Sequence, residues 1–120
     1  LLTDAADMVS YFFQTELDYD PANLVQRGTD RAATLASLHR TTAELDAMDS
    51  LEAAASEARF RLVGEELGLS PRQYFGTLRV ASTGRNATPP LFDTMEVLGM
   101  ERVAHRIRDA IAKLEGSEET

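Results

Sequence analysis

Two pairs of carboxylates have the type and spacing that could support chemistry. Glu65 and Glu66 are adjacent, and Asp18 and Asp20 are separated by one residue. Pairs of this kind can form a general acid–base dyad or part of a calcium ligand set. Carboxylates on a helix surface or in a turn are far more often simply solvated, and we favour that interpretation for both pairs.

Other residue types that carry catalysis are absent or badly spaced. The chain has no cysteine, which excludes disulfide frameworks and thiolate metal sites. His39 and His105 lack partners at zinc-ligand spacing, and no Ser/His/Asp or Cys/His arrangement is recognisable. No phosphate-binding G-x-x-x-x-G-K-[ST] loop occurs. We therefore predict no catalytic residue and no metal site, and expect the chain to bind a partner or hold something in place.

The net charge of −8 is unevenly distributed along the chain. Residues 1–60 carry four arginines against eleven acids, whereas residues 61–114 carry eight basic residues against six acids. Such asymmetry permits a local phosphate-facing surface on an acidic protein. On charge alone, an ordinary solvated surface remains the favoured interpretation.

Helical periodicity dominates the chain, and no stretch alternates as a strand would. We predict an all-α fold, a compact helical bundle or cage of six or seven helices, several of them short. One domain spans 1–120, with amino-terminal helices in 1–67, carboxy-terminal helices in 68–115 and a frayed tail in 116–120. The expected helices are 5–17, 30–48, 51–67, 70–75, 78–83, 91–98 and 100–114, and a short helical turn is expected at 22–26.

Several local features of these helices can be predicted. Ser50 is a suitable N-cap for helix 51–67, and Gly76 is expected to break or bend the chain before residue 78. The inward face expected for helix 51–67 comprises Leu51, Ala55, Ala58 and Leu62, and it is widened by Phe60, Val63 and Leu67. The outer stripe expected for helix 100–114 comprises Arg102, Arg106, Asp109 and Lys113.

Residues 78–92, which read LRVASTGRNATPPLF and which we call the corner, join two helices. Gly84 is suited to the left-handed conformation that closes a helix. A short polar loop follows, and Pro89 and Pro90 suit the first turn of the next helix. The corner displays Arg79, Arg85 and several hydroxyl groups, so it is the best candidate for a binding site.

The run LGLSPRQYFGTLRVASTGRNATPPLF, followed by VLGMERV and RIRDAIAKL, closely resembles the carboxy-terminal anticodon-binding domain of bacterial-type glutamyl-tRNA synthetases, which are class I aminoacyl-tRNA synthetases. That family carries P-L-R-V-A-L-T-G, a short loop, S/T-P-x-L-F and then L-G-x-E-x-x-x-x-R-L. The likeness is dense over 67–114, and FFQTELDYDP in the amino-terminal part is also similar. Residues 29–61 match only as helix. Thr77 stands where the family usually has proline, and Ser82 where it usually has leucine.

The resemblance implies an all-α domain that grips the anticodon loop of tRNA(Glu). By similarity, Arg79 together with Thr88, Pro89 and Leu91 would contact the first two anticodon bases. Arginine offers a rigid fork of donors, and single-stranded loop bases can be splayed out and bonded on their edges. Two other roles stay open, because Arg79 could pair with a helix carboxylate and Thr88 could cap the following helix. The arginine that helps to read the third base in the family would fall at or before Leu1, so no residue is named for it.

The residue types themselves suggest phosphate contacts from three arginines, Arg72, Arg85 and Arg102, for which pairing within the protein is an equally open role.

The resemblance also implies a parent enzyme, glutamate–tRNA ligase, that uses ATP with Mg in a catalytic domain of the same chain. The signatures HIGH and KMSKS do not occur here, so we expect an excised fragment that is inactive alone and holds no cofactor itself. The expected setting is a cytoplasmic monomer that binds tRNA(Glu) and no membrane. Whether the parent would also charge tRNA(Gln) cannot be read from these residues. The alternative function is a helical protein–protein interaction module that uses the acidic amino-terminal half or an apolar helix face.

Overall fold

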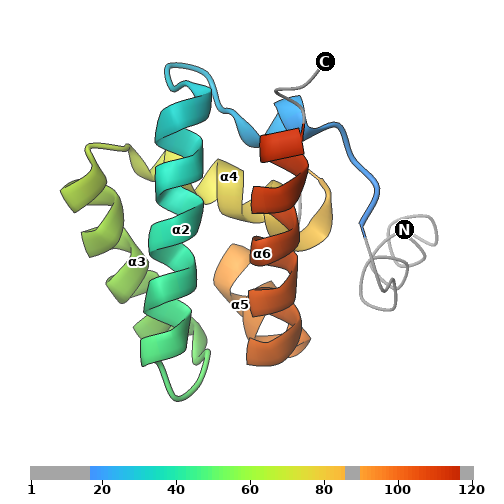
Figure 1. Cartoon of the computed structure of the whole chain (residues 1–120). Coiled ribbons are helices and arrows are strands. Elements are labelled where there is room, and N and C mark those ends of the chain that lie inside the picture. The colour runs from blue at the N-terminus through green and yellow to red at the C-terminus, as the bar shows by residue number, and fades with distance from the viewer. Residues whose placement is uncertain (1–16, 86–89, 117–120) are drawn as a thin grey trace.

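The computed structural model describes residues 17–85 and 90–116. These residues form five α-helices and one short 3-10 helix, without a strand (Figure 1). The elements are η1 (Pro21–Leu24), α2 (Arg31–Ala47), α3 (Ala53–Leu67), α4 (Pro71–Thr83), α5 (Leu91–Leu98) and α6 (Met100–Gly116). The all-α prediction is confirmed. The expected helix 5–17 lies mostly outside the described residues.

Helices α2 and α6 run side by side in opposite directions and form the front of the molecule in Figure 1. The start of α2 meets the end of α6, where Nε of Arg31 donates to the carbonyl oxygen of Leu114 at 3.3 Å. Helix α4 passes behind this pair, and α3 and α5 pack against each other beside it. This arrangement brings the helices that flank the corner into contact with both α3 and α6.

Helix α4 is continuous through Gly76, so the expected break there is wrong, and the predicted number of helices is slightly too high for this part of the chain. The helix begins with a reciprocal cap, in which Ser70 Oγ accepts from Gln73 N and Gln73 Oε1 accepts from Ser70 N. Gly76 serves close packing instead: a Cβ atom there would lie 2.6 Å from Oε1 of Gln26. The segment expected at 22–26 is the shorter 3-10 helix η1.

Helix α3 begins at Ala53 and Ser50 does not cap it, which corrects the predicted start. Its first turn is capped from another helix, because the Ala53 N–H donates to Oε1 of Glu96 on α5 at 3.1 Å. A side chain that is distant in the sequence thereby satisfies one of the N–H groups that every helix leaves orphaned at its start.

The buried face of α3 agrees with the prediction at Phe60 and Val63 and differs from it at Leu62. Its buried residues are Ser56, Phe60, Val63 and Gly64. Leu62, expected inside, is 63% exposed. Aromatic packing explains this rotation, because the ring of Phe60 meets the rings of Tyr74 and Phe92 with centroids 6.2 and 6.1 Å away. Gly64 lets Tyr74 approach closely, since a Cβ atom there would lie 3.2 Å from the tyrosine ring.

The core draws residues from every described element. Its largest fully buried side chains include Tyr74, Phe60, Leu24, Leu38, Leu78, Met95 and Ile107. Polar groups inside it are mostly paired: the Thr77 hydroxyl donates to the carbonyl oxygen of Leu24 at 2.7 Å, and Tyr74 Oη hydrogen-bonds Thr41 Oγ1. The first of these bonds holds η1 against α4.

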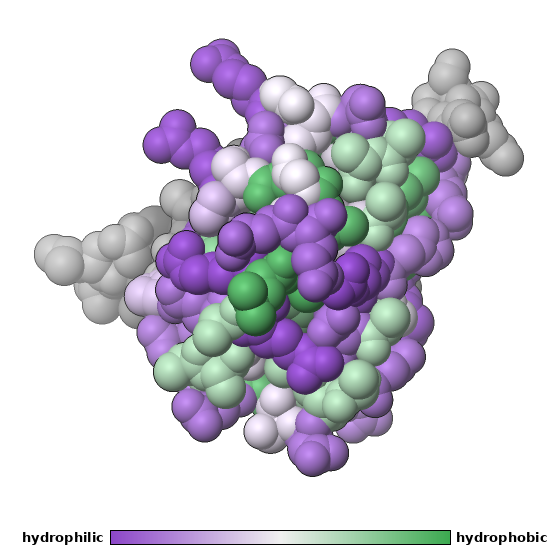
Figure 2. All heavy atoms as spheres, turned by 90° about the vertical axis from the view of Figure 1, so that its left-hand side faces the viewer, coloured by the Kyte–Doolittle hydropathy of each residue, from purple (hydrophilic) through white to green (hydrophobic). Residues whose placement is uncertain are grey.

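The surface of the described residues exposes two large apolar side chains, Leu62 on α3 and Val97 on α5. On the face shown in Figure 2, apolar and polar residues are interleaved. The alternative function, a protein–protein interaction module, would be favoured by a large exposed apolar patch, and this face does not present one continuous patch. None of the described helices is both long and apolar enough to cross a membrane.

Candidate nucleic-acid interface

Local hydrogen bonds shape the corner where α4 ends. Gly84 has a φ of 76°, as predicted for a left-handed closing residue, and its N–H donates to the Val80 carbonyl oxygen at 2.7 Å. The Thr83 hydroxyl donates to the carbonyl oxygen of Arg79 at 2.7 Å and accepts from the N–H of Arg85 at 3.1 Å. These bonds fix the direction in which the chain leaves α4.

Helix α6 holds the corner through Arg106. This side chain is 2% exposed, and its Nη1 donates to the carbonyl oxygen of Ser82 at 2.6 Å. The expectation that Arg106 belongs to the outer stripe is therefore wrong. Its spacing from Val103 and Ala110 places it on the buried face of α6. A guanidinium is tolerated there because the end of α4 offers it an acceptor.

The sequence contained a signal for this arginine. Arg106 is the arginine of the L-G-x-E-x-x-x-x-R pattern that begins at Leu98. Its positioning role became evident only when the structure brought α6 to the end of α4.

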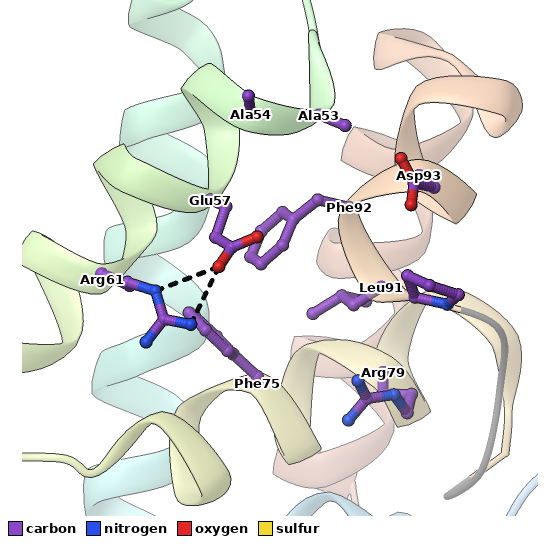
Figure 3. Close-up of a pocket in the computed structure, with 10 residues that line it drawn as sticks. Ala53, Ala54, Glu57, Arg61, Phe75, Arg79, Leu91, Phe92 and Asp93 are labelled. Atoms are coloured by element: carbon purple, nitrogen blue, oxygen red, sulfur yellow. Dashed lines mark hydrogen bonds and ion pairs between the residues drawn. The ribbon is translucent and has the colours of Figure 1, made fainter.

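A groove of about 450 Å³ lies beside the corner, between α3, α4 and the start of α5 (Figure 3). The residues that line it are Ala53, Ala54, Glu57 and Arg61 of α3, Phe75 and Arg79 of α4, and Pro90, Leu91, Phe92 and Asp93 at the start of α5. Arg79 and Leu91, predicted as base contacts, thus line the same groove.

The α3 side of the groove carries an ion pair that sequence reasoning missed. Nη2 and Nε of Arg61 donate to Oε2 of Glu57 at 2.8 and 3.1 Å. The Arg61 guanidinium lies over the ring of Phe75, 5.5 Å from its centroid. Glu57 and Arg61 are four residues apart and so share one helix face, but this spacing by itself does not say that the face borders a groove.

Comparison with known proteins decides the family. Residues 1–111 match a family model described as the anticodon binding domain. The chain belongs to this family. Similar proteins include the glutamate–tRNA ligases of Roseiflexus castenholzii (42% identical over 94% of this chain), Dehalococcoides mccartyi (41% over 94%) and Rhodococcus jostii (38% over 97%). This anticodon-binding domain spans only 22%, 23% and 24% of the length of these three relatives, respectively.

The predicted base contacts of the anticodon-binding domain have different surroundings. Arg79 is partly exposed and Leu91 is 3% exposed, so Leu91 offers the groove only the edge of a core side chain. Thr88 and Pro89 lie outside the described residues. Pro90 is the N-cap residue of α5, one position before the first turn in which it was expected.

The three arginines predicted to contact phosphate do not form one cluster. Arg72 and Arg85 lie at opposite ends of α4, roughly 20 Å apart at 1.5 Å per residue. Arg102 is exposed in the first turn of α6. Any phosphate contacts would therefore be spread around the anticodon-binding domain.

Within the described ranges, no three His, Asp or Glu side chains are grouped in a way that could hold a metal ion.

Proposed function

We propose that this anticodon-binding domain reads the anticodon loop of tRNA(Glu) as part of a glutamate–tRNA ligase. The observation that carries the proposal is the groove between α3, α4 and α5, which both Arg79 and Leu91 line. Arginine donates hydrogen bonds in a planar fork, and leucine packs against a base without desolvating a polar group. Together they suit an unstacked base, which is how proteins read single-stranded RNA loops.

The residues that continue the corner complete the proposed site. By resemblance, Thr88 and Pro89 would contact the anticodon beside Arg79 and Leu91. Arg72, Arg85 and Arg102 would contact backbone phosphates, which orient an RNA without reading its sequence. Their spread over the surface suits a stem-loop that is held at several points.

In a full-length ligase, the catalytic chemistry would belong to the larger part of the protein, outside the region that these 120 residues match. The curated relatives are ligases of which this region makes up less than a quarter. We propose that ATP with Mg binds in that larger part, that the 120-residue chain alone does not aminoacylate tRNA, and that the enzyme is a cytoplasmic monomer. Aminoacylation assays of the 120-residue chain and of the whole enzyme, together with light scattering, test these points.

Binding of anticodon stem-loops tests the reading role directly. The 120-residue chain is titrated with the tRNA(Glu) stem-loop and with stem-loops altered at each anticodon position. Wild type should prefer the cognate stem-loop, and Arg79→Ala should lose about tenfold or more of that preference, since one good base contact supplies discrimination of this order. Arg108→Ala removes an exposed arginine from α6 and should keep the preference. Equal affinity of wild type for every stem-loop would contradict the proposal.

A further inference from the structure

The ion pair on the α3 side of the groove leaves specific atoms available to a ligand. Both hydrogen bonds from Arg61 end on Oε2 of Glu57, so Oε1 can accept another hydrogen bond. The bonds use Nε and Nη2 of Arg61, so Nη1 can still donate. An acceptor and a donor therefore lie close together on one wall of the groove.

The pair is held in place and is also reachable. Phe75 lies under the Arg61 guanidinium and is itself packed edge-on against Phe92, with ring centroids 5.0 Å apart. The Arg61 and Glu57 side chains are nevertheless 50% and 46% exposed. An ion pair this exposed contributes little to folding, so its atoms can be used for binding without loss of the fold.

The shape and charge of the groove select its occupant. Its volume of about 450 Å³ is that of a small-molecule pocket and admits a single unstacked base, whereas a duplex cannot enter. A phosphate is disfavoured because the Glu57 carboxylate would repel it. A nucleobase suits the pair, because its edge presents an N–H group next to an acceptor.

We propose that Glu57 and Arg61 form a second base-reading wall of the groove, opposite Arg79 and Leu91 (Figure 3). Oε1 of Glu57 accepts an N–H group of one anticodon-loop base, Nη1 of Arg61 donates to the neighbouring acceptor, and Phe75 and Leu91 give apolar surface to the ring. This inference rests on the proposed function and adds two specificity-determining residues to it.

Glu57→Met is the most informative variant, because it removes the acceptor oxygens together with one negative charge and keeps a side chain of similar size. If Glu57 acted only through its charge, its loss would tighten binding of every stem-loop about equally. A base contact predicts the opposite sign: about tenfold weaker binding of the cognate stem-loop, with discrimination lost at one anticodon position and kept at the other two. Arg61→Gln should weaken binding and lose discrimination at that same position.

Arg59→Gln is the matched control on the same helix. Arg59 pairs with Glu44 of α2 at 2.6 Å and does not line the groove. This variant removes the same charge as Arg61→Gln, so both share the non-specific loss of RNA affinity, but it should keep discrimination at all three positions. Urea denaturation of each variant verifies that it is folded.

The outcomes separate this inference from the proposed function. If wild type discriminates among anticodons and Glu57→Met keeps discrimination at all three positions, or tightens all stem-loops equally, the second wall is refuted while the reading role stands. If wild type binds all stem-loops with equal affinity, the proposed function fails and the second wall fails with it.

Discussion

Arg106 of α6 donates from Nη1 to the backbone carbonyl oxygen of Ser82 on α4 at 2.6 Å, although 24 positions separate the two residues. Ser82 lies in the last turn of α4, where carbonyl groups have no partner within the helix. A cation is also favourable at the negative end of the helix dipole. The bond thus joins the end of α4, from which the corner loop departs, to the buried face of α6.

Replacing Arg106 with methionine should destabilise the fold. The substitution keeps an extended side chain but leaves the buried Ser82 carbonyl oxygen without this donor, which costs about 1–3 kcal/mol. Urea denaturation measures the loss. Arg108→Met, an exposed site on the same helix, should change stability by no more than about 0.5 kcal/mol. Equal effects of the two substitutions would show that the bond to Ser82 is unimportant for stability.

Ser82→Ala should stabilise the protein. The Ser82 hydroxyl is buried, and it has no hydrogen-bond partner in the part of the chain that the structure describes. Removing an unsatisfied buried polar group is expected to raise the free energy of unfolding by about 1 kcal/mol. Ser37 is the matched control, since its buried hydroxyl donates to the Thr34 carbonyl oxygen at 2.7 Å. The thermal midpoint of Ser82→Ala should exceed that of Ser37→Ala, and the reverse order would contradict this account.

Thr77→Val should loosen η1 from α4. The Thr77 side chain is 3% exposed, and valine keeps its shape while removing the donor to the Leu24 carbonyl oxygen. Gln26 Nε2 also donates to this oxygen, but at 3.4 Å, so the variant leaves the acceptor with only its weaker donor, which costs about 1 kcal/mol. Thr42→Val serves as the control, because the Thr42 hydroxyl bonds only a carbonyl oxygen of its own helix, at 3.2 Å. Chemical denaturation of both variants measures the loss of stability. A loss no larger for Thr77→Val than for Thr42→Val would show that the bond to Leu24 does not stabilise the fold.

Alkaline pH should destabilise the protein through Tyr74, which is fully buried, and through Tyr19, which is partly buried. Burial raises the pKa of Tyr74 to about 12, whereas a tyrosine of the unfolded chain has a pKa near 10. Below pH ~10 both states keep the proton, so stability does not change. From pH ~10 to 12 only the unfolded state loses it, and stability falls by about 1.4 kcal/mol per pH unit for this group.

Tyr74→Phe tests that linkage. Urea denaturation at several pH values should show a shallower decline above pH ~10 for the variant than for wild type. Some decline should remain, because burial also raises the pKa of Tyr19. Identical slopes for the two proteins would mean that Tyr74 does not carry the linkage.

Salt dependence distinguishes phosphate contacts from base contacts. If Arg72 and Arg102 bind phosphates, then Arg72→Ala and Arg102→Ala should each weaken all stem-loops alike and reduce the slope of log affinity against log salt by about 0.7–1. Arg79→Ala should instead change the preference among stem-loops. Titrations at several salt concentrations measure both quantities, and unchanged slopes would assign Arg72 and Arg102 to the solvated surface.

Local features of the fold could be predicted because neighbouring residues encode them. The left-handed conformation of Gly84 follows from backbone sterics. The bounds of α2, expected at 30–48 and found at Arg31–Ala47, follow from the helical pattern of residues close in the sequence. The all-α class follows from helical periodicity in the same way. The resemblance added the family and the base-contact candidates Arg79 and Leu91, and the family match supports it.

Features that depend on packing could not be predicted. Leu62 has the right period for an inward residue, yet the interlocking rings of Phe60, Tyr74 and Phe92 rotate α3 so that Leu62 faces outward. Glu96 replaces the expected cap Ser50 because α5 brings its carboxylate to the start of α3. Such outcomes depend on the fit of side chains from several helices.

The sequence by itself determined the helices, most of their ends and the family of the chain, because these depend on short-range patterns of residue types. Only the tertiary structure decided that Arg106 supports the end of α4 and that Glu57 and Arg61 face Arg79 and Leu91 across one groove. Residues from α3, α4, α5 and α6 must meet to make these contacts, and the close packing of the core determines where they meet.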